Sequence, residues 1–420
     1  MRHEPSTPEP SIPGARATSP EPPRARRRVV VTGMGAVTAA GRGVERFWRA
    51  CVEGRSALRP DARFSAGDPR LLPLGLVGDP FPADEERASA LALDACDEAV
   101  RGAGFAAGGA PPRGAGLVLG TCLGGAIATL GWIDDVERRG APALRDCPFP
   151  GPGGLAAPAL RLAARHGLTG PVSTMSTACS SGTGAVAAAA DAIRRGESDV
   201  MFAGGVDALS AFVVSGFGLL RALASTEVRP FDRRRDGLAL GEGAAIVVLE
   251  EAGSARRRGA PILAEILGAG TALDAHHMTG PSPDGAGVVR AITAALSEAG
   301  AAAESVDFIS AHGTGTSFND RMETVAFKRL FGGRAALIPI DSVKPIIGHT
   351  LGAAGALEAI LCARVLAEGI VPPTINYREP DPECDLDYVP NEARRVVVRR
   401  ALSTSSGFGG HNAALFLGAP

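Results

Sequence analysis

Two stretches of this chain repeat the same order of short apolar runs and helix-forming segments. The first stretch has the strand-like runs VVVTGMG, GLVLGT, MFAGGVDAL and AAIVVLEE, with helical patterns at residues 87–103 and after Cys179. From about Leu263 the order recurs, with AEILGAG, DFISAHGTGT and AALFLG as strands and helices at 287–299 and after His349. CSSGTGAVAAAADAIRRG can be laid over HTLGAAGALEAILCARVLAEG. The pattern predicts a layered α/β protein with an internal duplication, whose two halves meet at a pseudo-twofold seam.

The chain divides into three predicted segments. Residues 1–27 are rich in proline and arginine and are expected to form a disordered arm. Residues 28–262 form the half that carries Cys179, and residues 263–420 form the half that carries two candidate histidines. The basic run Arg26 to Arg28 is expected to be solvated rather than to contact an acidic partner.

Composition limits the class of protein. The chain has 420 residues, 45% of them hydrophobic, so we expect a large globular protein with an ample core. A formal net charge of −2 argues against nucleic acid as the main partner. No apolar run reaches the roughly 18 residues that a membrane span needs, and the first 28 residues lack the hydrophobic region of a signal peptide. Seven cysteines without a spacing pattern fit a reducing compartment, so we predict a cytoplasmic protein.

Cys179 is the candidate nucleophile. It lies in STACSSG, shortly before the alanine-rich segment 185–195, so its thiol is expected at or near a helix N-terminus. Unpaired N–H groups and the positive end of the helix dipole favour a thiolate there. Small neighbours leave room for a long substrate to reach the sulfur. The other six cysteines are expected to pack as small hydrophobic residues.

Two histidines occur in glycine-rich settings. His312 follows the strand-like run 308–311 and enters a turn of glycine and threonine, which predicts a ring exposed in a cleft. His349 follows Gly348 and precedes the helix-forming segment 351–367. A helix start disfavours imidazolium, so His349 is expected to stay neutral. Two neutral imidazole N–H donors can stabilise the enolate of a thioester.

Lys344 stands out because it is one of only two lysines among 43 basic residues. A compact ammonium differs from a planar guanidinium in reach and geometry, so this position is expected to need lysine. Asp320 and Glu323 follow His312 at a spacing that puts both on one face of a helical turn. They are expected either to pair with Lys344 or to be surface acids that cap a helix at 320–330.

Other chemistries that use cysteine and histidine have less support. The sequence has no C-x-x-C, H-x-x-x-H or other short ligand pair, so we expect no metal. A papain-like hydrolase would not need a second glycine-flanked histidine and a lysine. The partial dinucleotide fingerprint at residues 33–35 lacks its third glycine, and a tight strand-to-loop turn explains it. No P-loop sequence is present.

Six motifs occur in an order and spacing that point to one family: TACSSG, RPFDRRRDGLALGEGA, AHGTGTSFND, SVKPIIGHTLGAAG, PDPECDLDYVPNEAR and GFGGHN. From about Arg28 to Gly418 the chain resembles an elongating β-ketoacyl-acyl carrier protein synthase of the thiolase superfamily. The resemblance implies a thiolase-like fold with five αβαβα layers built from two halves. It also implies a homodimer and no metal or organic cofactor.

The resemblance implies a catalytic role for four residues. Cys179 would accept an acyl group from acyl carrier protein. His312 and His349 would activate malonyl carrier protein for decarboxylation, and Lys344 would organise the site near His312. Enolate attack on the enzyme thioester would then give a 3-oxoacyl carrier protein that is two carbons longer.

Other matched residues would support this chemistry. Asp320 and Glu323 match the acidic pair that supports the site. Phe408 matches the gate, and its backbone N–H with that of Cys179 would form the oxyanion hole. Leu123, in GTCLGG, matches a position that lines the acyl pocket.

Two glycine-rich segments, 229–243 and 403–412, are expected to be loops at the edge of the same cleft. An acyl carrier protein has an acidic surface, and Arg221, Arg233 and Arg234 are candidates to receive it because they lie near these motifs.

One departure from the family pattern bears on the pathway. Ser406 replaces an aromatic residue that fatty acid elongation enzymes usually carry at the gate. Together with NDRMETVAFKRLFG and DPECDLDYVP, this makes the chain similar to ketosynthase subunits of type II polyketide systems, which often work beside a sister subunit that lacks the nucleophile. We therefore predict condensation in polyketide or polyene assembly, as a homodimer or as a heterodimer with such a sister subunit.

Three alternatives stay open. A housekeeping fatty acid elongation synthase would use the same chemistry with saturated acyl carrier proteins. A thiolase acting on coenzyme A esters would need a second cysteine near the C-terminal glycine-rich segment, and none is present there. A non-catalytic subunit that only docks the carrier protein would not need Cys179, His312, Lys344 and His349 together.

Overall fold

The computed structural model describes residues 26–64, 72–78, 86–105, 111–149 and 151–420. Nearly all of the predicted disordered arm lies outside these ranges. The basic run at its end is held by the body of the protein, because each guanidinium pairs with an acid of the same chain: Arg26 with Glu298, Arg27 with Asp199, and Arg28 with Glu265. Arg26 and Arg28 are nevertheless exposed, so the run contacts solvent as expected, although its side chains are paired within the chain.

Among the described residues, one large sheet runs in the order β11-β10-β14-β15-β9-β1-β8-β7-β5-β6, and the short strand β2 pairs with β1. The strands of the first half are β1 (Val29–Thr38), β2 (Gly41–Arg42), β5 (Gly116–Gly120), β6 (Val172–Met175), β7 (Val200–Asp207) and β8 (Gly243–Glu251). Those of the second half are β9 (Ala264–Leu273), β10 (Phe308–Ser310), β11 (Ile340–Asp341), β14 (Arg400–Gly407) and β15 (His411–Gly418).

The two halves of the sheet have the same topology. In each half, the strand that comes first in the sequence pairs antiparallel with the strand that comes last. That last strand pairs antiparallel with a third strand on its other side, and two more strands follow in parallel toward the edge of the sheet. Thus β1-β8-β7-β5-β6 corresponds to β9-β15-β14-β10-β11. The halves join where β1 pairs with β9, for example Val29 with Ile266. This repeated topology is what the repeated sequence pattern predicts.

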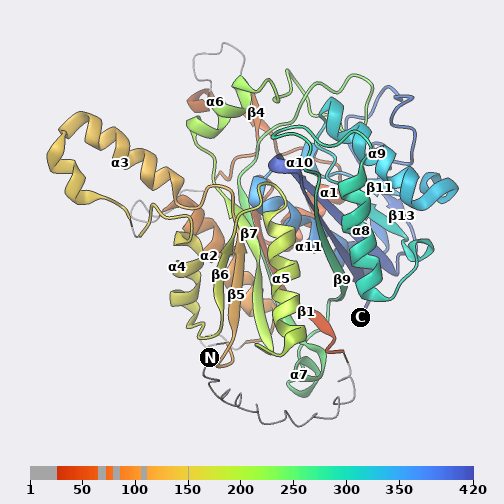
Figure 1. Cartoon of the computed structure of the whole chain (residues 1–420), viewed down its shortest axis with the longest axis horizontal. Coiled ribbons are helices and arrows are strands. Elements are labelled where there is room, and N and C mark those ends of the chain that lie inside the picture. The colour runs from red at the N-terminus through yellow and green to blue at the C-terminus, as the bar shows by residue number, and fades with distance from the viewer. Residues whose placement is uncertain (1–25, 65–71, 79–85, 106–110, 150) are drawn as a thin grey trace, which may run out of the picture.

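The helices and the two half-sheets form five layers (Figure 1). On the first half, α2 (Arg87–Gly102) and α4 (Ala157–His166) pack against the outer face and share an apolar core with β5, β7 and β8. On the second half, α8 (Ala286–Ala299) and α9 (Ser317–Phe331) form the opposite outer layer. Between the two half-sheets lie α5 (Ser181–Arg195) and α11 (Ala354–Glu368), which pack against each other in the largest core. The expected αβαβα arrangement is confirmed.

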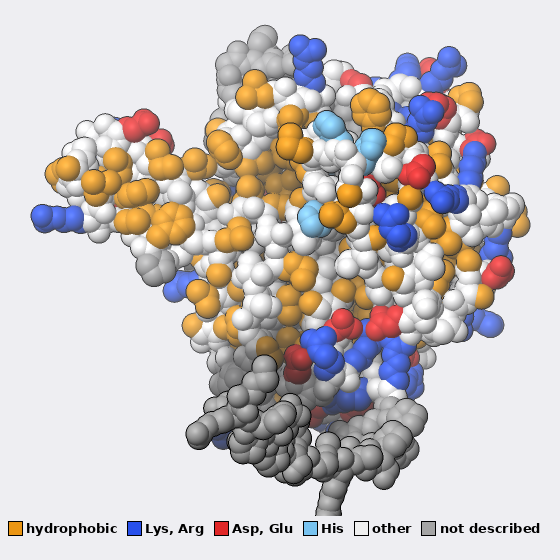
Figure 2. Space-filling model, in the orientation of Figure 1, with side chains coloured by type: hydrophobic (Ala, Val, Ile, Leu, Met, Phe, Trp, Pro, Cys, Tyr) orange, Lys and Arg blue, Asp and Glu red, His pale blue; other side chains and the backbone are white. Residues whose placement is uncertain are grey.

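The remaining helices and strands lie at the margins of these layers. α3 (Ala126–Arg139) projects from the body, and none of its described side chains is buried; hydrophobic side chains cover part of this projection (Figure 2). The others are α1 (Val44–Val52), α6 (Ala211–Leu219), α7 (Ala252–Arg257), α10 (Lys344–Ile347), β3 (Arg59–Pro60), β4 (Pro73–Leu74), β12 (Ile370–Val371) and β13 (Arg394–Arg395). No described helix combines the length and apolar character needed to cross a membrane.

Gly33 and Gly35 serve helix packing rather than a turn. Strand β1 continues through both residues to Thr38, so the predicted strand-to-loop turn is wrong. A Cβ atom on Gly33 would lie 2.2 Å from the carbonyl oxygen of Ala99, and one on Gly35 would lie 1.9 Å from that of Ala95. The glycines therefore let the backbone of α2 approach β1 closely.

Two further local predictions need correction. Residues 403–407 are not a loop, because they form the end of strand β14, and only a short 3₁₀ turn at Phe408–Gly410 separates it from β15. Helix α9 begins at Ser317, earlier than expected, so Asp320 and Glu323 lie inside the helix. Both side chains are fully buried and cannot be surface caps.

Candidate active site

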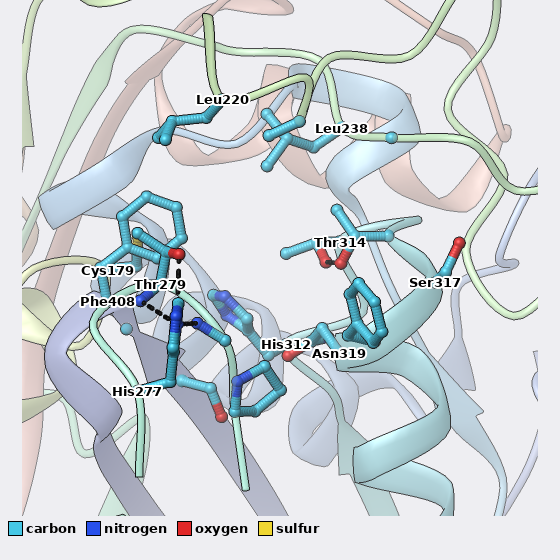
Figure 3. A pocket seen from close by; sticks show the side chains of 18 of the residues that line it. Cys179, Leu220, Leu238, His277, Thr279, His312, Thr314, Ser317, Asn319 and Phe408 are labelled. Carbon is cyan, nitrogen blue, oxygen red and sulfur yellow. Dashed lines mark hydrogen bonds between the residues drawn. The ribbon is translucent and has the colours of Figure 1, made fainter. Parts of the chain in front are cut away.

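A cavity of about 510 Å³ opens at the seam and is lined by both halves. Figure 3 shows Cys179 and Phe408 close together on one side, His312 facing the same space, and Leu220 and Leu238 across from them. The first half also contributes Phe217, Arg221, Asp236 and Gly237, and the second half contributes Asp274, His276, His277, Thr279, Thr314, Phe318, Asn319, His349, Ser406, Gly407 and Asn412. Parts of both predicted glycine-rich segments therefore border the cavity.

Cys179 is held by a tight turn directly before α5. Ala178 adopts a left-handed conformation, with φ of 52°, which is unfavourable for a residue with a Cβ atom. The turn is fixed by Ser181, whose hydroxyl accepts a hydrogen bond from the N–H of Thr177 at 2.9 Å and donates to the carbonyl of Ala178 at 2.5 Å. The predicted position of Cys179 at a helix start is confirmed.

The predicted thiolate is not favoured in the free enzyme. Cys179 is only 7% exposed, and burial raises the pKa of its thiol to about 12. Lys344 and the backbone N–H groups of Cys179 and Phe408 lower this pKa, but burial outweighs them. The same two N–H groups face the sulfur.

We expect alkylation of Cys179 by iodoacetamide to accelerate by about tenfold per pH unit between pH 7 and 9.5, because the thiolate fraction rises by that factor below the pKa. The rate constant of inactivation, followed by the mass of the intact protein, measures this. A plateau near neutral pH would show that the thiol is already ionised there. Cys147, which is exposed, provides an internal control for the reagent.

His312 and His349 lie together in the wall of the cavity, and both side chains are buried, so the predicted exposed ring of His312 is wrong. Their ring centroids are 5.1 Å apart and the rings are nearly perpendicular. The backbone N–H of His349 donates to the carbonyl of Ala239 at 2.7 Å, which fixes His349 against the other half. Burial lowers the pKa of both imidazoles well below the usual value, and Lys344 lowers it further. Both rings are therefore neutral, as predicted for His349, although burial and Lys344 are the causes.

The two acids of α9 shape the loop that carries His312. Glu323 accepts hydrogen bonds from the backbone N–H groups of His312 and Gly313, each at 2.7 Å. Asp320 accepts from the N–H of Phe231 at 2.7 Å and from that of Gly315 at 3.2 Å. Neither acid pairs with Lys344, so that prediction is wrong.

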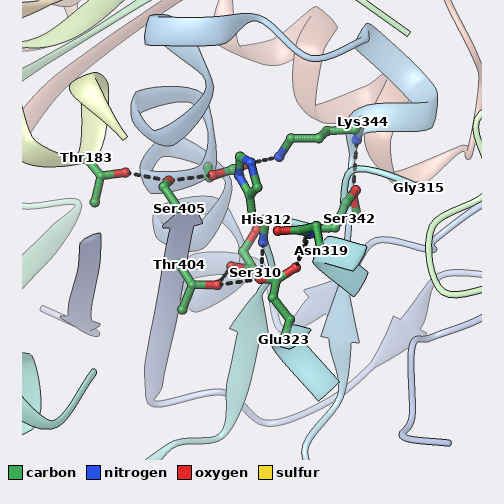
Figure 4. A network of polar contacts seen from close by, with 12 residues as sticks. Thr183, Ser310, His312, Gly315, Asn319, Glu323, Ser342, Lys344, Thr404 and Ser405 are labelled. Carbon is green, nitrogen blue, oxygen red and sulfur yellow. Dashed lines mark hydrogen bonds and ion pairs between the residues drawn. The ribbon is translucent and has the colours of Figure 1, made fainter. Parts of the chain in front are cut away.

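Lys344 instead pairs with Glu358 of α11, with 2.6 Å between Nζ and Oε1. Figure 4 shows Lys344 above the loop of His312, and Ser405 next to Thr183. Ser405 donates to the other Glu358 oxygen at 3.3 Å, and its hydroxyl lies 2.7 Å from that of Thr183. The pair is fully buried, so the ammonium of Lys344 acts on Cys179 and both histidines with little screening.

Phe408 and Leu123 lie on the side of the cavity that faces α6. The ring of Phe408 stacks on Phe217, with centroids 5.6 Å apart. Leu123 does not line the cavity; like Phe217, it packs against an apolar cluster that contains Val213, Leu238 and further aliphatic residues. Sequence reasoning missed Phe217, which lines the cavity and also packs against this cluster.

Residues 26–73 and 84–255 match the N-terminal domain of beta-ketoacyl synthases, and residues 263–378 match their C-terminal domain. The chain belongs to the β-ketoacyl synthase family. This synthase is 40% identical to the tetracenomycin polyketide synthase ketoacyl synthase alpha subunit of Streptomyces glaucescens, over 94% of this chain and 98% of that protein. It is 39% identical to 3-oxoacyl-(acyl-carrier-protein) synthase 2 of Synechocystis sp., over 93% of this chain and 97% of that protein.

Solved structures of ketosynthases resemble this synthase along most of its length. The ishigamide ketosynthase/chain length factor superposes with a TM-score of 0.87 at 38% identity, covering 94% of this chain and 100% of the other. A type II polyketide synthase ketosynthase, solved with its acyl-carrier protein and bound to the hexaketide, also gives a TM-score of 0.87, at 32% identity and with the same coverage.

Proposed function

We propose that this synthase catalyses the decarboxylative condensation of an acyl group on Cys179 with malonyl carrier protein, giving a 3-oxoacyl carrier protein. The observation that carries the proposal is the convergence of one buried thiol and two neutral imidazoles on a single cavity at the seam, with the buried ammonium of Lys344 close enough to lower the pKa of all three. Family membership supports the same reaction class.

In the first half-reaction, the sulfur of Cys179 attacks the carbonyl carbon of an acyl carrier protein thioester. The backbone N–H groups of Cys179 and Phe408 receive the oxyanion. The carrier thiolate leaves and takes the proton given up by Cys179, so the enzyme becomes an acyl thioester without net change in charge.

In the second half-reaction, His312 and His349 donate hydrogen bonds to the carbonyl oxygen of the malonyl thioester. Carbon dioxide leaves, and the electron pair of the broken bond forms an enolate that these donors stabilise. The enolate carbon attacks the acyl carbon on Cys179, and the thiolate that is released takes up one proton. Neutral rings suit this role because their N–H groups donate hydrogen bonds to the thioester oxygen. A positively charged imidazolium would instead pair with the malonyl carboxylate that has to leave as carbon dioxide.

We place the reaction in polyketide or polyene assembly rather than in fatty acid elongation. Ser406 at the gate, where its hydroxyl donates to Asn412 at 2.8 Å, leaves more room beside Phe408 than an aromatic residue would. Similarity to the tetracenomycin subunit and to the ishigamide ketosynthase supports this choice. Housekeeping fatty acid elongation is the alternative, because similarity to the Synechocystis enzyme is nearly as high.

We propose acyl carrier protein as the substrate carrier and a second ketosynthase-type chain as the partner, in the cytoplasm. Arg221 lines the cavity and is the candidate contact for the carrier, whereas Arg234 pairs with Glu379 at 3.1 Å. The projecting α3, with Ile133 41% exposed, supports a subunit interface in a homodimer or a heterodimer with a sister subunit. A subunit that only docks the carrier protein would not need Cys179, His312, Lys344 and His349 together, and a thiolase would need a second cysteine at the site.

Mass spectrometry of the intact enzyme tests the proposal. The enzyme and its Cys179→Ala variant are mixed with a panel of acyl carrier proteins, and then with malonyl carrier protein. We expect an acyl adduct on the wild type alone, which is chased to a 3-oxoacyl product and identifies the primer class. If no donor acylates Cys179, even with a co-purified partner chain, the proposed condensation is wrong.

A further inference from the structure

Asp341 is a buried carboxyl group that the condensation described above does not use. It ends strand β11 and is fully buried. In the register of the parallel strands it stands beside Ser310 of β10, which stands beside Ser403 of β14. No hydrogen bond of good geometry reaches either carboxyl oxygen of Asp341, or either serine hydroxyl, from the described residues. Three neighbouring strands thus carry a row of buried oxygen atoms without a well-formed hydrogen bond, although the hydroxyl of Ser310 lies near the Asp341 carboxyl.

This row lies directly before the catalytic groups. Strand β10 leads to His312, strand β11 leads to Lys344, and strand β14 leads to Phe408. A charge on the row would therefore act at the base of the active site, in a region without solvent screening.

The groups that face Asp341 decide whether it can hold a charge. Lys344 of α10 is the cation near it, Glu358 and Cys362 face it from α11, and Cys51 faces it from α1. Burial raises the pKa of both thiols well above the usual value, so they are neutral. Lys344 is already paired with Glu358 at 2.6 Å. An ionised Asp341 would add a second negative charge beside a pair that is already balanced.

Such a charge is unfavourable because a buried carboxylate loses its hydration, and the contact with Ser310 and the charge of Lys344 return only part of that loss. Burial raises the pKa of Asp341 well above its ordinary value, and the charge of Glu358 raises it further. Ser310 and Lys344 oppose this shift without overcoming it.

We propose that Asp341 is a positioning residue that stays protonated in the working enzyme, so that Glu358 alone balances Lys344 and the ammonium still acts on Cys179 and His312. The catalytic part of this inference rests on the proposed condensation. The protonation state of Asp341 does not, and can be measured without any substrate.

The first experiment measures stability against pH by urea unfolding of the wild type and Asp341→Asn. An acid whose pKa is higher in the folded state than in the unfolded state does not lower the stability at a pH below its unfolded pKa. As the pH rises from the unfolded pKa to the folded pKa, this acid lowers the stability progressively. The stability of Asp341→Asn relative to the wild type should therefore increase from pH 5 to 8, by up to about tenfold in the unfolding equilibrium constant per pH unit. Ser403→Ala, in the same row but uncharged, should show no such trend. A constant difference for Asp341→Asn would mean that Asp341 is ionised, and would overturn the proposal.

The second experiment tests the effect on the site. We expect Asp341→Ala to slow condensation at pH 7 and Asp341→Asn, which mimics the protonated acid, to restore the rate to within about twofold of the wild type. Above pH 9, alkylation of Cys179 should become faster in Asp341→Asn than in the wild type, because only the wild type gains a negative charge. A folded Asp341→Asn that loses tenfold or more in condensation would show that the ionised form is needed. If condensation is absent from every variant, the proposed function fails, while unfolding and alkylation still decide the role of Asp341.

Discussion

Replacement of Lys344 by methionine is expected to lower the rate of condensation by about 100-fold or more, the size of effect seen when one preorganised electrostatic group is lost. The buried ammonium lowers the pKa of the Cys179 thiol and of both imidazoles. Without it, the sulfur is harder to ionise. Steady-state condensation and the rate of Cys179 alkylation at pH 8 should therefore both fall.

The same variant is expected to lose about 3–5 kcal/mol of stability, because Glu358 is left as a buried carboxylate without its partner. A matched control separates the two effects. Lys344→Met combined with Glu358→Gln removes both charges and should recover most of the stability but none of the activity. Recovery of activity in the double variant would show that Lys344 acts only through folding.

Replacement of Asp207 by alanine should have the largest effect on stability. This fully buried carboxylate, at the end of β7, accepts hydrogen bonds from the hydroxyl of Thr121 at 2.7 Å, from the N–H of Leu123 at 2.8 Å and from that of Gly352 at 2.7 Å. It thereby joins the loop after β5 to the turn that follows His349. At about 1–3 kcal/mol for each buried group left without a partner, we expect a loss of several kcal/mol.

The urea midpoint of unfolding measures the effect of Asp207→Ala. Asp207→Asn keeps one acceptor oxygen and should lose clearly less stability. An Asp207→Ala variant that unfolds at the wild-type midpoint would show that Thr121 and Gly352 find other partners, and that the carboxylate does not hold the two turns together.

The alternation of strands and helices was predictable because apolar periodicity is local. The bounds of α2 and α8 differ from the prediction by one residue at one end. Convergence of Cys179, His312 and His349 was also predictable, since each follows a strand or precedes a helix in a repeated pattern. The end of β14 was missed because its serines and glycine resemble a loop when their pairing with β15 is unknown.

The partners of the candidate catalytic groups could not be found from local patterns. Asp207 binds Gly352, a residue 145 positions away. Glu358 gave one usable signal: it is an acid within the apolar helix ALEAILCARVL, and a buried charge of this kind needs a cation. The wrong expectation of a thiolate at Cys179 has a similar origin, because the depth of burial that raises its pKa depends on the packing of both halves.

Because of the position of β14, the site around Cys179 can be completed only when the end of the chain has been synthesised. This strand inserts between β10 and β15, and β15 in turn pairs with β9, so the last hairpin completes the middle of the second half-sheet. Phe408, whose N–H faces the sulfur of Cys179, is part of that hairpin. On the ribosome, therefore, the nucleophile emerges more than two hundred residues before Phe408, the last of the groups that face it. A nascent or truncated chain carries the thiol without the means to use it.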